Sequence, residues 1–337
     1  MKHPLPNSFV TRPVRIALVG CGGNGTQMLT GLARMHIALR AFGHPGFEVC
    51  AYDPDRVSEA NIGRQLFSPA DVGHHKAVLL VHRLNVFFGL DWQAIPEIFP
   101  SPDDEQAESY MNNYQAPGIV IGCVDTRASR RAIAKWGNRF AWQAGQHRDN
   151  DHYWLDVGNL SNTGQVVLGQ FTPKPPTRKK LNSRPKTLME TMGGRKISEE
   201  DALAAWRREL LPLHLPNIGD LFPGILDDTQ PEEDLPSCSL AEALESQDLF
   251  VNQAVTTFAL QLLWMWFRQG GLTHHGYFVN LATGSVSRLP IDKAAWARFN
   301  PALCGIKPLD SGITKIKKNA SRVKRKTKPK PKTKTTR

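Results

Sequence analysis

Residues 15–25 read Arg15-Ile16-Ala17-Leu18-Val19-Gly20-Cys21-Gly22-Gly23-Asn24-Gly25. A short apolar run meets a glycine cluster, and apolar residues at helical spacing follow, which predicts a strand, a tight turn and a helix. In such a turn the first glycine permits the bend, the second lets the backbone approach a phosphate, and the last lets the helix pack on the strand. The helix N-terminus then presents N–H groups to an anion. Any strand–glycine–helix turn can mimic this pattern, so alone it is a weak signal.

Charged residues after the next strand sharpen the prediction. The apolar run Phe47 to Tyr52 ends in Asp53-Pro54-Asp55, where an acid holds a nucleotide ribose in related folds. Asn61-Ile62-Gly63-Arg64-Gln65 and Gly73-His74-His75-Lys76 come next. A nucleoside triphosphate requires Arg and Lys here more than a dinucleotide does, because charge builds on its phosphates as they separate. We therefore favour a triphosphate.

The rest of the chain alternates strands with helices. Ile119 to Val124 is continuously apolar, ends in Asp125, and is expected to be a strand buried on both faces. Helices are predicted at 73–89, 103–114, 127–140, 199–211 and 240–268, strands at 92–95, 153–157 and 164–171, and a hairpin at 277–281 and 285–289. This order predicts an α/β, Rossmann-like, doubly wound and mostly parallel sheet, whose ligands lie at the carboxyl ends of the strands.

Together these motifs resemble a known superfamily. The order G-x-G-G-x-G, D-x-D, N-x-x-R-Q, G-x-x-K and a later Asp closing a strand resembles the ThiF/MoeB and ubiquitin-activating enzymes (HesA/MoeB/ThiF). Within them the chain is most similar to the ThiF family protein of the bacterial PRTRC system. The resemblance implies an enzyme that uses ATP and Mg²⁺ to adenylate the C-terminal carboxylate of a small ubiquitin-like or sulfur-carrier protein, and it implies a homodimer. The cysteine usage described below predicts that the enzyme is cytoplasmic.

The resemblance also assigns roles to residues. The positions expected to bind the nucleotide are Gly20, Gly22, Gly23, Gly25, Asp53, Asp55, Asn61 and Gln65, with Asp53 on the ribose. The positions expected to be catalytic are Arg64, Lys76, Asp125 and Cys238. Asp125 would bind Mg²⁺, because a hard cation prefers carboxylate oxygen. The alternative for Asp125 is that it caps the following helix.

Cys238 has a further expected role. In thioester-forming members a cysteine before a late helix takes the acyl group from AMP. Here Ser239-Leu240-Ala241-Glu242 has the capping-box pattern and predicts a helix directly after Cys238, whose N-terminus would lower the pKa of the thiol. Nearby acids such as Asp227 and Asp228 act in the opposite direction. An inert loop cysteine is therefore the alternative.

The cysteine count gives a second expectation. Five widely spaced cysteines without a Cys-x-x-Cys pair favour a reducing compartment. Many members hold a structural zinc between two such pairs, so we expect no zinc here. The adjacent histidines His74/His75 and His274/His275 are expected at the surface rather than on a metal.

Composition divides the chain into four parts. Residues 1–171 are expected to be the ATP-binding Rossmann-like core, 172–239 a linker or crossover region with the candidate cysteine, 240–310 a helix and hairpin completing the same fold, and 311–337 a disordered basic tail. The net charge is +11, and the tail holds twelve Lys and Arg without an acid, so residues 1–310 sum to −1. No signal segment and no apolar run of about 20 residues is present, so we expect a soluble protein without membrane contact.

Three alternatives remain open. The tail either binds nucleic-acid phosphates without sequence specificity or is simply solvated, and the lack of interleaved aromatic residues weakens a dedicated single-strand binding function. An enzyme alternative keeps the adenylation and omits the thioester. A different class is a dinucleotide-binding or non-catalytic scaffold protein of a plasmid cassette, with the tail on DNA.

Overall fold

The computed structural model describes residues 1–99, 116–144, 152–171, 214–229 and 247–304. The strands are β1 His3–Pro4, β2 Val14–Val19, β3 Phe47–Tyr52, β4 Gln93–Ile95, β5 Ile119–Gly122, β6 Tyr153–Asn159, β7 Thr163–Gln170, β8 Gly271–Leu272, β9 His274–Asn280 and β10 Ser285–Pro290. The α-helices are α1 Asn7–Thr11, α2 Gly23–Ala41, α3 Lys76–Phe88, α5 Arg127–Ala144, α9 Ile218–Leu221, α11 Val251–Gln269 and α12 Lys293–Phe299. Short 3-10 helices are η1 Glu59–Asn61, η2 Pro69–Asp71, η3 Pro223–Leu226 and η4 Pro301–Cys304.

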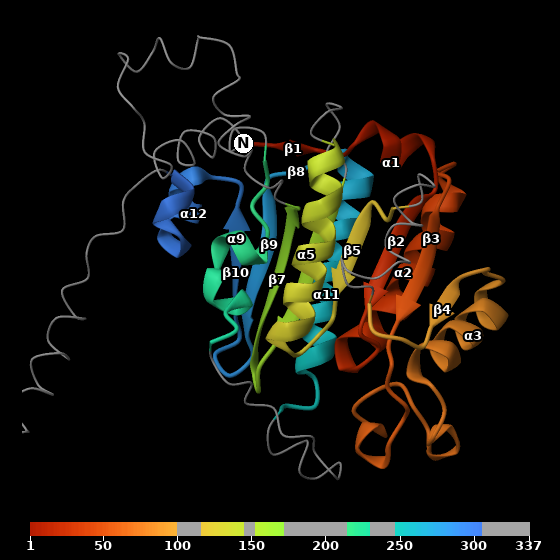
Figure 1. Ribbon diagram of the computed structural model, residues 1–337. Helices are drawn as coiled ribbons and strands as arrows, with labels where there is room; N and C mark the ends of the chain where they lie inside the picture. The colour runs from red at the N-terminus through yellow and green to blue at the C-terminus, as the bar shows by residue number, and fades with distance from the viewer. Residues whose placement is uncertain (100–115, 145–151, 172–213, 230–246, 305–337) are drawn as a thin grey trace, which may run out of the picture.

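An eight-stranded sheet forms the centre, in the order β10-β9-β7-β6-β5-β2-β3-β4. The five strands from β4 to β6 run parallel, and the pairs β6–β7, β7–β9 and β9–β10 are antiparallel. Figure 1 shows α5 in front of this sheet and α11 behind it. The prediction of an α/β, doubly wound, mostly parallel sheet is confirmed.

The strand order reverses between β2 and β5, and this reversal places the site. β2 leads through α2 to β3 on one side, whereas β5 lies on its other side. Every residue of β5 is buried, as its continuous apolar run predicted. Ligands of doubly wound sheets bind in the crevice outside the carboxyl ends of the strands at such a reversal. The ends of β2 and β5 therefore mark the candidate site.

The C-terminal hairpin joins the same sheet. β9 pairs with β7 from Thr163↔Asn280 to Val167↔Gly276, and β10 pairs with β9. The predicted hairpin is thus confirmed, and strands from before and after residues 172–239 build one sheet. The four-part division of the chain remains a prediction.

The helix predicted from Leu240 is wrong over residues 247–250, which form a bend and a turn before α11 begins at Val251. The Asp248 amide donates to the Ser161 carbonyl oxygen at 2.9 Å, outside any helix. A tertiary contact therefore replaces the local helical hydrogen bond that the capping-box pattern suggested.

The predicted surface position of His274 and His275 is also wrong. Both are buried in β9, with His275 fully enclosed. Trp296 Nε1 donates to His275 Nε2 at 2.8 Å. An indole only donates, so the neutral ring keeps its proton on Nδ1 and donates to the Leu168 carbonyl oxygen at 2.7 Å. Hydrogen bonds from two distant segments thus satisfy a ring that the sequence left without a partner.

Several predictions lie outside the described residues. They are the helices at 103–114 and 199–211, most of the linker region, Cys238 with its capping box, and the basic tail. Among the described helices, none combines the length and the apolar character that a membrane crossing requires.

His275 generates a pH-dependence prediction. Burial lowers its pKa from 6.5 to about 3, so below pH 6.5 the unfolded ring binds a proton that the folded ring does not. Stability is therefore lost as the pH falls from 6.5 toward 3, by about 2 kcal/mol at pH 5 from this group. In denaturant unfolding at pH 7 and pH 5, His275→Gln should lose less stability between the two pH values than the wild type does.

The matched control is His82→Gln, since His82 is exposed on α3. It should leave the difference between pH 7 and pH 5 unchanged. If His275→Gln also keeps the full wild-type difference, this ring does not carry the acid sensitivity.

Candidate functional site

The turn after β2 depends on two close approaches. Gly20 has φ 92°, and a Cβ there would lie 2.5 Å from the Cys123 carbonyl oxygen. A Cβ on Gly25 would overlap the Gly20 carbonyl oxygen. The Gly20 amide donates to the Tyr52 carbonyl oxygen at 2.8 Å. Glycine is therefore required to bring the turn against the ends of β3 and β5.

Asp53 fastens this turn to the end of β3. Its buried carboxylate accepts the Cys21 amide on one oxygen and the Asp55 amide on the other, the latter at 2.8 Å. Burial raises the pKa of Asp53, and these two amides lower it in part. The residue predicted to hold the ribose thus also holds the shape of the turn.

Asp55 and Lys76 form the next link. Lys76 Nζ lies 3.0 Å from Asp55 Oδ2, and the Lys76 amide donates to the Asp55 carbonyl oxygen at 3.0 Å. The Lys76 side chain is only 9% exposed whereas that of Asp55 is 64% exposed. Of the two acids of the D-x-D motif, Asp55 is the one open to an incoming ligand.

Asn61 has a local contact. Its side-chain oxygen accepts the Ser58 amide at 3.0 Å and lies 3.2 Å from the Ser58 hydroxyl oxygen. Its carbonyl oxygen accepts the Gln65 amide at 2.9 Å. Asn61 therefore shapes the loop that carries Arg64 and Gln65.

Gln65 lies beside the glycine turn, and Arg64 precedes it in the same loop. A Cβ on Gly22 would lie 3.9 Å from Gln65 Nε2. Arg64 Nη1 donates to Gln247 Oε1 at 3.0 Å. Within the described part of the chain, the buried Arg64 Nε and Gln65 Oε1 have no hydrogen-bond partner. Two unpaired buried polar atoms of opposite kind suit a polar ligand.

Asp125 follows the end of β5 and is exposed. The Ser129 amide donates to Thr126 Oγ1 at 3.1 Å, so Thr126 supplies a cap at the start of α5. The alternative that Asp125 also caps this helix stays open.

A buried ion pair holds the Asp125 backbone. Arg130 Nη1 donates to the Asp125 carbonyl oxygen at 3.0 Å, and Arg130 Nε lies 3.0 Å from Asp156 Oδ1. Gln165 Nε2 donates to the other Asp156 oxygen at 3.3 Å. Sequence reasoning missed this pair, although Asp156 inside an apolar strand was a usable signal, because a buried acid requires a partner.

Burial raises the pKa of the Cys21 and Cys123 thiols, which is typical of cysteines that pack in a core rather than react. Among the residues that the structure describes, no three His, Cys, Asp or Glu side chains gather as a metal site.

Taken together, most of the predicted residues lie in one place. The turn from Gly20 to Gly25 lies against Cys123, Gln65 and Asn252. Arg64 is connected to Asn252 through the side-chain oxygen of Gln247. Lys76 is connected to Cys21 in the turn through Asp55 and Asp53. Gln247 and Asn252 were missed, since nothing in the sequence joins the start of α11 to the glycine turn. The arrangement presents two cations, an exposed acid and uncapped amides, which suits a polyphosphate.

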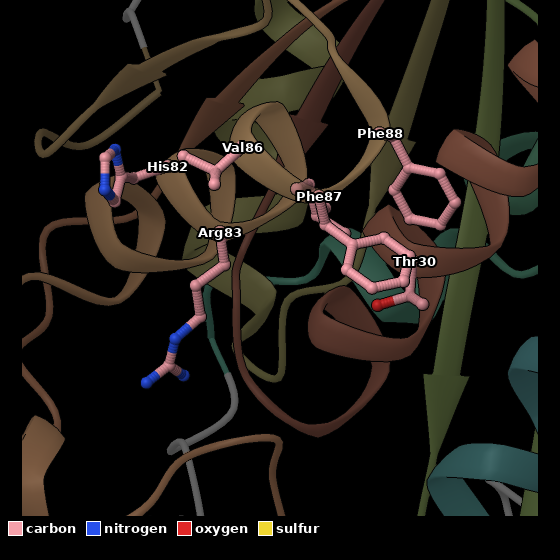
Figure 2. A pocket seen from close by; sticks show the side chains of 7 residues that line it. Thr30, His82, Arg83, Val86, Phe87 and Phe88 are labelled. Carbon is pink, nitrogen blue, oxygen red and sulfur yellow. The ribbon is translucent and has the colours of Figure 1, made fainter.

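A cavity of about 520 Å³ lies elsewhere, between α2 and the C-terminal half of α3. Figure 2 shows Phe87 and Phe88 beside Thr30, with Arg83 pointing away. Its lining is mostly apolar and includes none of the predicted site residues. It is therefore distinct from the candidate nucleotide site.

Comparison with known proteins gives a family and a set of similar folds. The profile described as ThiF family matches residues 10–291. Among solved structures, selenomethionine PaaA has 13% identity and a TM-score of 0.46, with 82% of this chain and 64% of that chain covered. E. coli MccB with ATP has 12% identity and a TM-score of 0.45, with 85% and 65% covered.

The chain therefore spans just under two thirds of the length of these structures, and likenesses of this degree carry no information on activity. No curated protein sequence matches the chain.

The Arg130–Asp156 pair generates a stability prediction. Its side chains are 8% and 0% exposed, so Asp156→Asn leaves a buried guanidinium without a counter-charge. We expect a loss of about 3 kcal/mol in the free energy of unfolding, measured by denaturant titration.

Glu48→Gln is the matched control, because it breaks the exposed Arg15–Glu48 pair by the same acid-to-amide change. It should alter stability by less than about 1 kcal/mol. Equal effects of the two substitutions would contradict a structural role for the buried pair.

Proposed function

Because this chain belongs to the ThiF family, we propose that it is an ATP-dependent adenylating enzyme whose nucleotide lies at the carboxyl ends of β2, β3 and β5. Its substrate is the C-terminal carboxylate of a small ubiquitin-like or sulfur-carrier protein. The observation that carries the proposal is that Gln65 lies against the glycine turn and that Arg64 is joined to the same turn through Gln247 and Asn252. The buried Lys76 beside the turn supports it.

The reaction joins a carboxylate oxygen to the α-phosphorus of ATP, breaks the bond to the β-phosphate oxygen and releases pyrophosphate. It needs positioning and charge neutralisation more than a general base. Lys76 and Arg64 neutralise phosphate charge, and the amides of the turn and of α2 bind phosphate oxygens. Asp55, which follows β3 and is exposed, would help Asp53 to hold the ribose.

Asp125 would hold Mg²⁺, which supplies charge neutralisation to the phosphates when bound. Mg²⁺ usually keeps several waters and binds through one or two carboxylates together with substrate phosphates. One exposed carboxylate at a strand end fits that preference. The Arg130–Asp156 pair then fixes the backbone from which this carboxylate projects.

The finer parts of the proposal extend beyond the described residues. Cys238 would attack the acyl carbon of the adenylate as a thiolate, form a thioester and release AMP. We also propose a cytoplasmic homodimer of the PRTRC type, with the basic tail outside the catalytic site. The competing function is a dinucleotide-binding or scaffold protein, which NADH binding without exchange would support.

Asp125→Ala tests the metal assignment. It should reduce carrier-dependent ATP–pyrophosphate exchange by at least about 100-fold, because an electrostatic contact of the transition state is lost. The melting temperature should stay within a few degrees of wild type, since the substituted side chain is exposed. Asp91→Ala, an exposed acid between α3 and β4, should leave exchange intact.

Full exchange in Asp125→Ala would remove this residue from the reaction.

Cys238→Ser separates the two chemical steps. Exchange should persist, because the adenylate forms before the thiol acts, whereas a carrier adduct that reductant cleaves should disappear. Mass spectrometry of the protein with ATP, Mg²⁺ and carrier measures the adduct. A wild-type protein that forms adenylated carrier and never this adduct has no thioester step.

A further inference from the structure

The helices α2 and α11 run parallel and are packed unusually closely. A Cβ added to Gly23 would overlap the Asn252 side chain, and one added to Gly31 would overlap that of Leu260. The second contact lies eight residues further along each helix than the first one does. The two helices are therefore aligned in register, and their N-termini lie side by side next to the glycine turn.

Two adjacent helix N-termini repel each other, because each carries about half a positive charge. Neither α2 nor α11 has a side-chain cap or an acidic residue in its first turn, and their N-cap residues are Gly22 and Phe250. The Val251 amide, the first of α11, donates to the Asp248 carbonyl oxygen at 3.3 Å, and no side chain caps the other first-turn amides of either helix in the described structure. An anion between the two ends would relieve this repulsion.

Side chains around the two N-termini point to the same ligand. Gln247 Oε1 accepts from Arg64 Nη1 at 3.0 Å and from Asn252 Nδ2 at 3.4 Å. Arg64 Nε, a donor that suits an anionic oxygen, is buried and has no partner among the described residues. The unpaired Asn24 Oδ1 and Gln65 Oε1 nearby are acceptors and suit a hydroxyl or water instead. The neutral side-chain oxygen of Gln247 therefore lies where the Arg64 guanidinium and the Asn252 amide group converge.

We propose that the N-terminus of α11 forms the second half of the phosphate site, with Asn252 as a phosphate-binding residue and Gln247 as the group that phosphate displaces from Arg64. The ligand class is a polyphosphate chain, and the inference rests on the proposed nucleotide site. Displacement is favourable because a phosphate oxygen carries a negative charge that attracts the guanidinium, whereas the Gln247 amide oxygen is neutral. The glycine turn supplies one helix end, and the C-terminal half of the chain supplies the other.

Asn252→Asp tests the proposal without removing volume. The helix N-terminus favours a carboxylate at this buried position and offsets part of the cost of burying its charge, whereas the same carboxylate repels an anion between the helices. Isothermal calorimetry with inorganic tripolyphosphate should show at least ten-fold weaker binding. Binding of adenosine, which has no phosphate, should change less than two-fold.

A second variant and a matched control complete the test. Gln247→Glu places a carboxylate on Arg64 and should also weaken tripolyphosphate binding, at a position that is only half-buried. Gln253→Glu adds the same charge on the same turn of α11, on its exposed side, and should bind within two-fold of wild type.

The outcomes separate this inference from the proposed function. Wild-type binding in both Asn252→Asp and Gln247→Glu overturns the inference even if exchange is normal, as does an equal loss in Gln253→Glu or a wild-type protein that binds no tripolyphosphate. If tripolyphosphate binding follows the expected pattern but the wild-type protein shows no carrier-dependent exchange, the phosphate site is supported and the adenylation is overturned.

Discussion

The contact on which the structure depends is the close approach of the Gly20 turn to the Cys123 carbonyl oxygen, where the strand order of the sheet reverses. Because glycine has no Cβ, the turn can approach this carbonyl closely, and β2 and β5 end at the same level. The Asp53 carboxylate secures the arrangement by accepting the amides of Cys21 and Asp55. These contacts fix the turn after β2 and the ends of β3 and β5 relative to one another without the help of a ligand.

In this site, buried charged side chains hold exposed acidic residues in position. The enclosed Arg130–Asp156 pair holds the backbone of the exposed Asp125, and the buried Lys76 is paired with the exposed Asp55. Such pairs contribute little net stability, since desolvation offsets their attraction, and they do restrict geometry. A site that must neutralise phosphates needs cations held in place, and this arrangement supplies them at the edge of a nearly neutral fold whose net charge resides in its tail.

Much of the first half could be predicted from local patterns. The turn from Gly20 to Gly25, the acids Asp53 and Asp55, and the strand ending before Asp125 follow from apolar runs and glycines that are adjacent in the chain. Two predictions were wrong because contacts between distant segments prevailed. Asp248 bonds to Ser161 instead of continuing a helix, and His275 is enclosed between Leu168 and Trp296. Cys238 stays a prediction.

By itself the sequence determined the α/β alternation, the glycine turn and the charged residues that follow it in the chain. Each of these features depends on the spacing of residues that are only a few positions apart. Only the tertiary structure decided that α11 lies parallel to α2, that Gln247 accepts a hydrogen bond from Arg64, and that Asp156 neutralises Arg130. These contacts join residues from 26 to 229 positions apart in the chain. No local preference encodes such pairings; they follow from burying the apolar faces of strands and helices in one sheet.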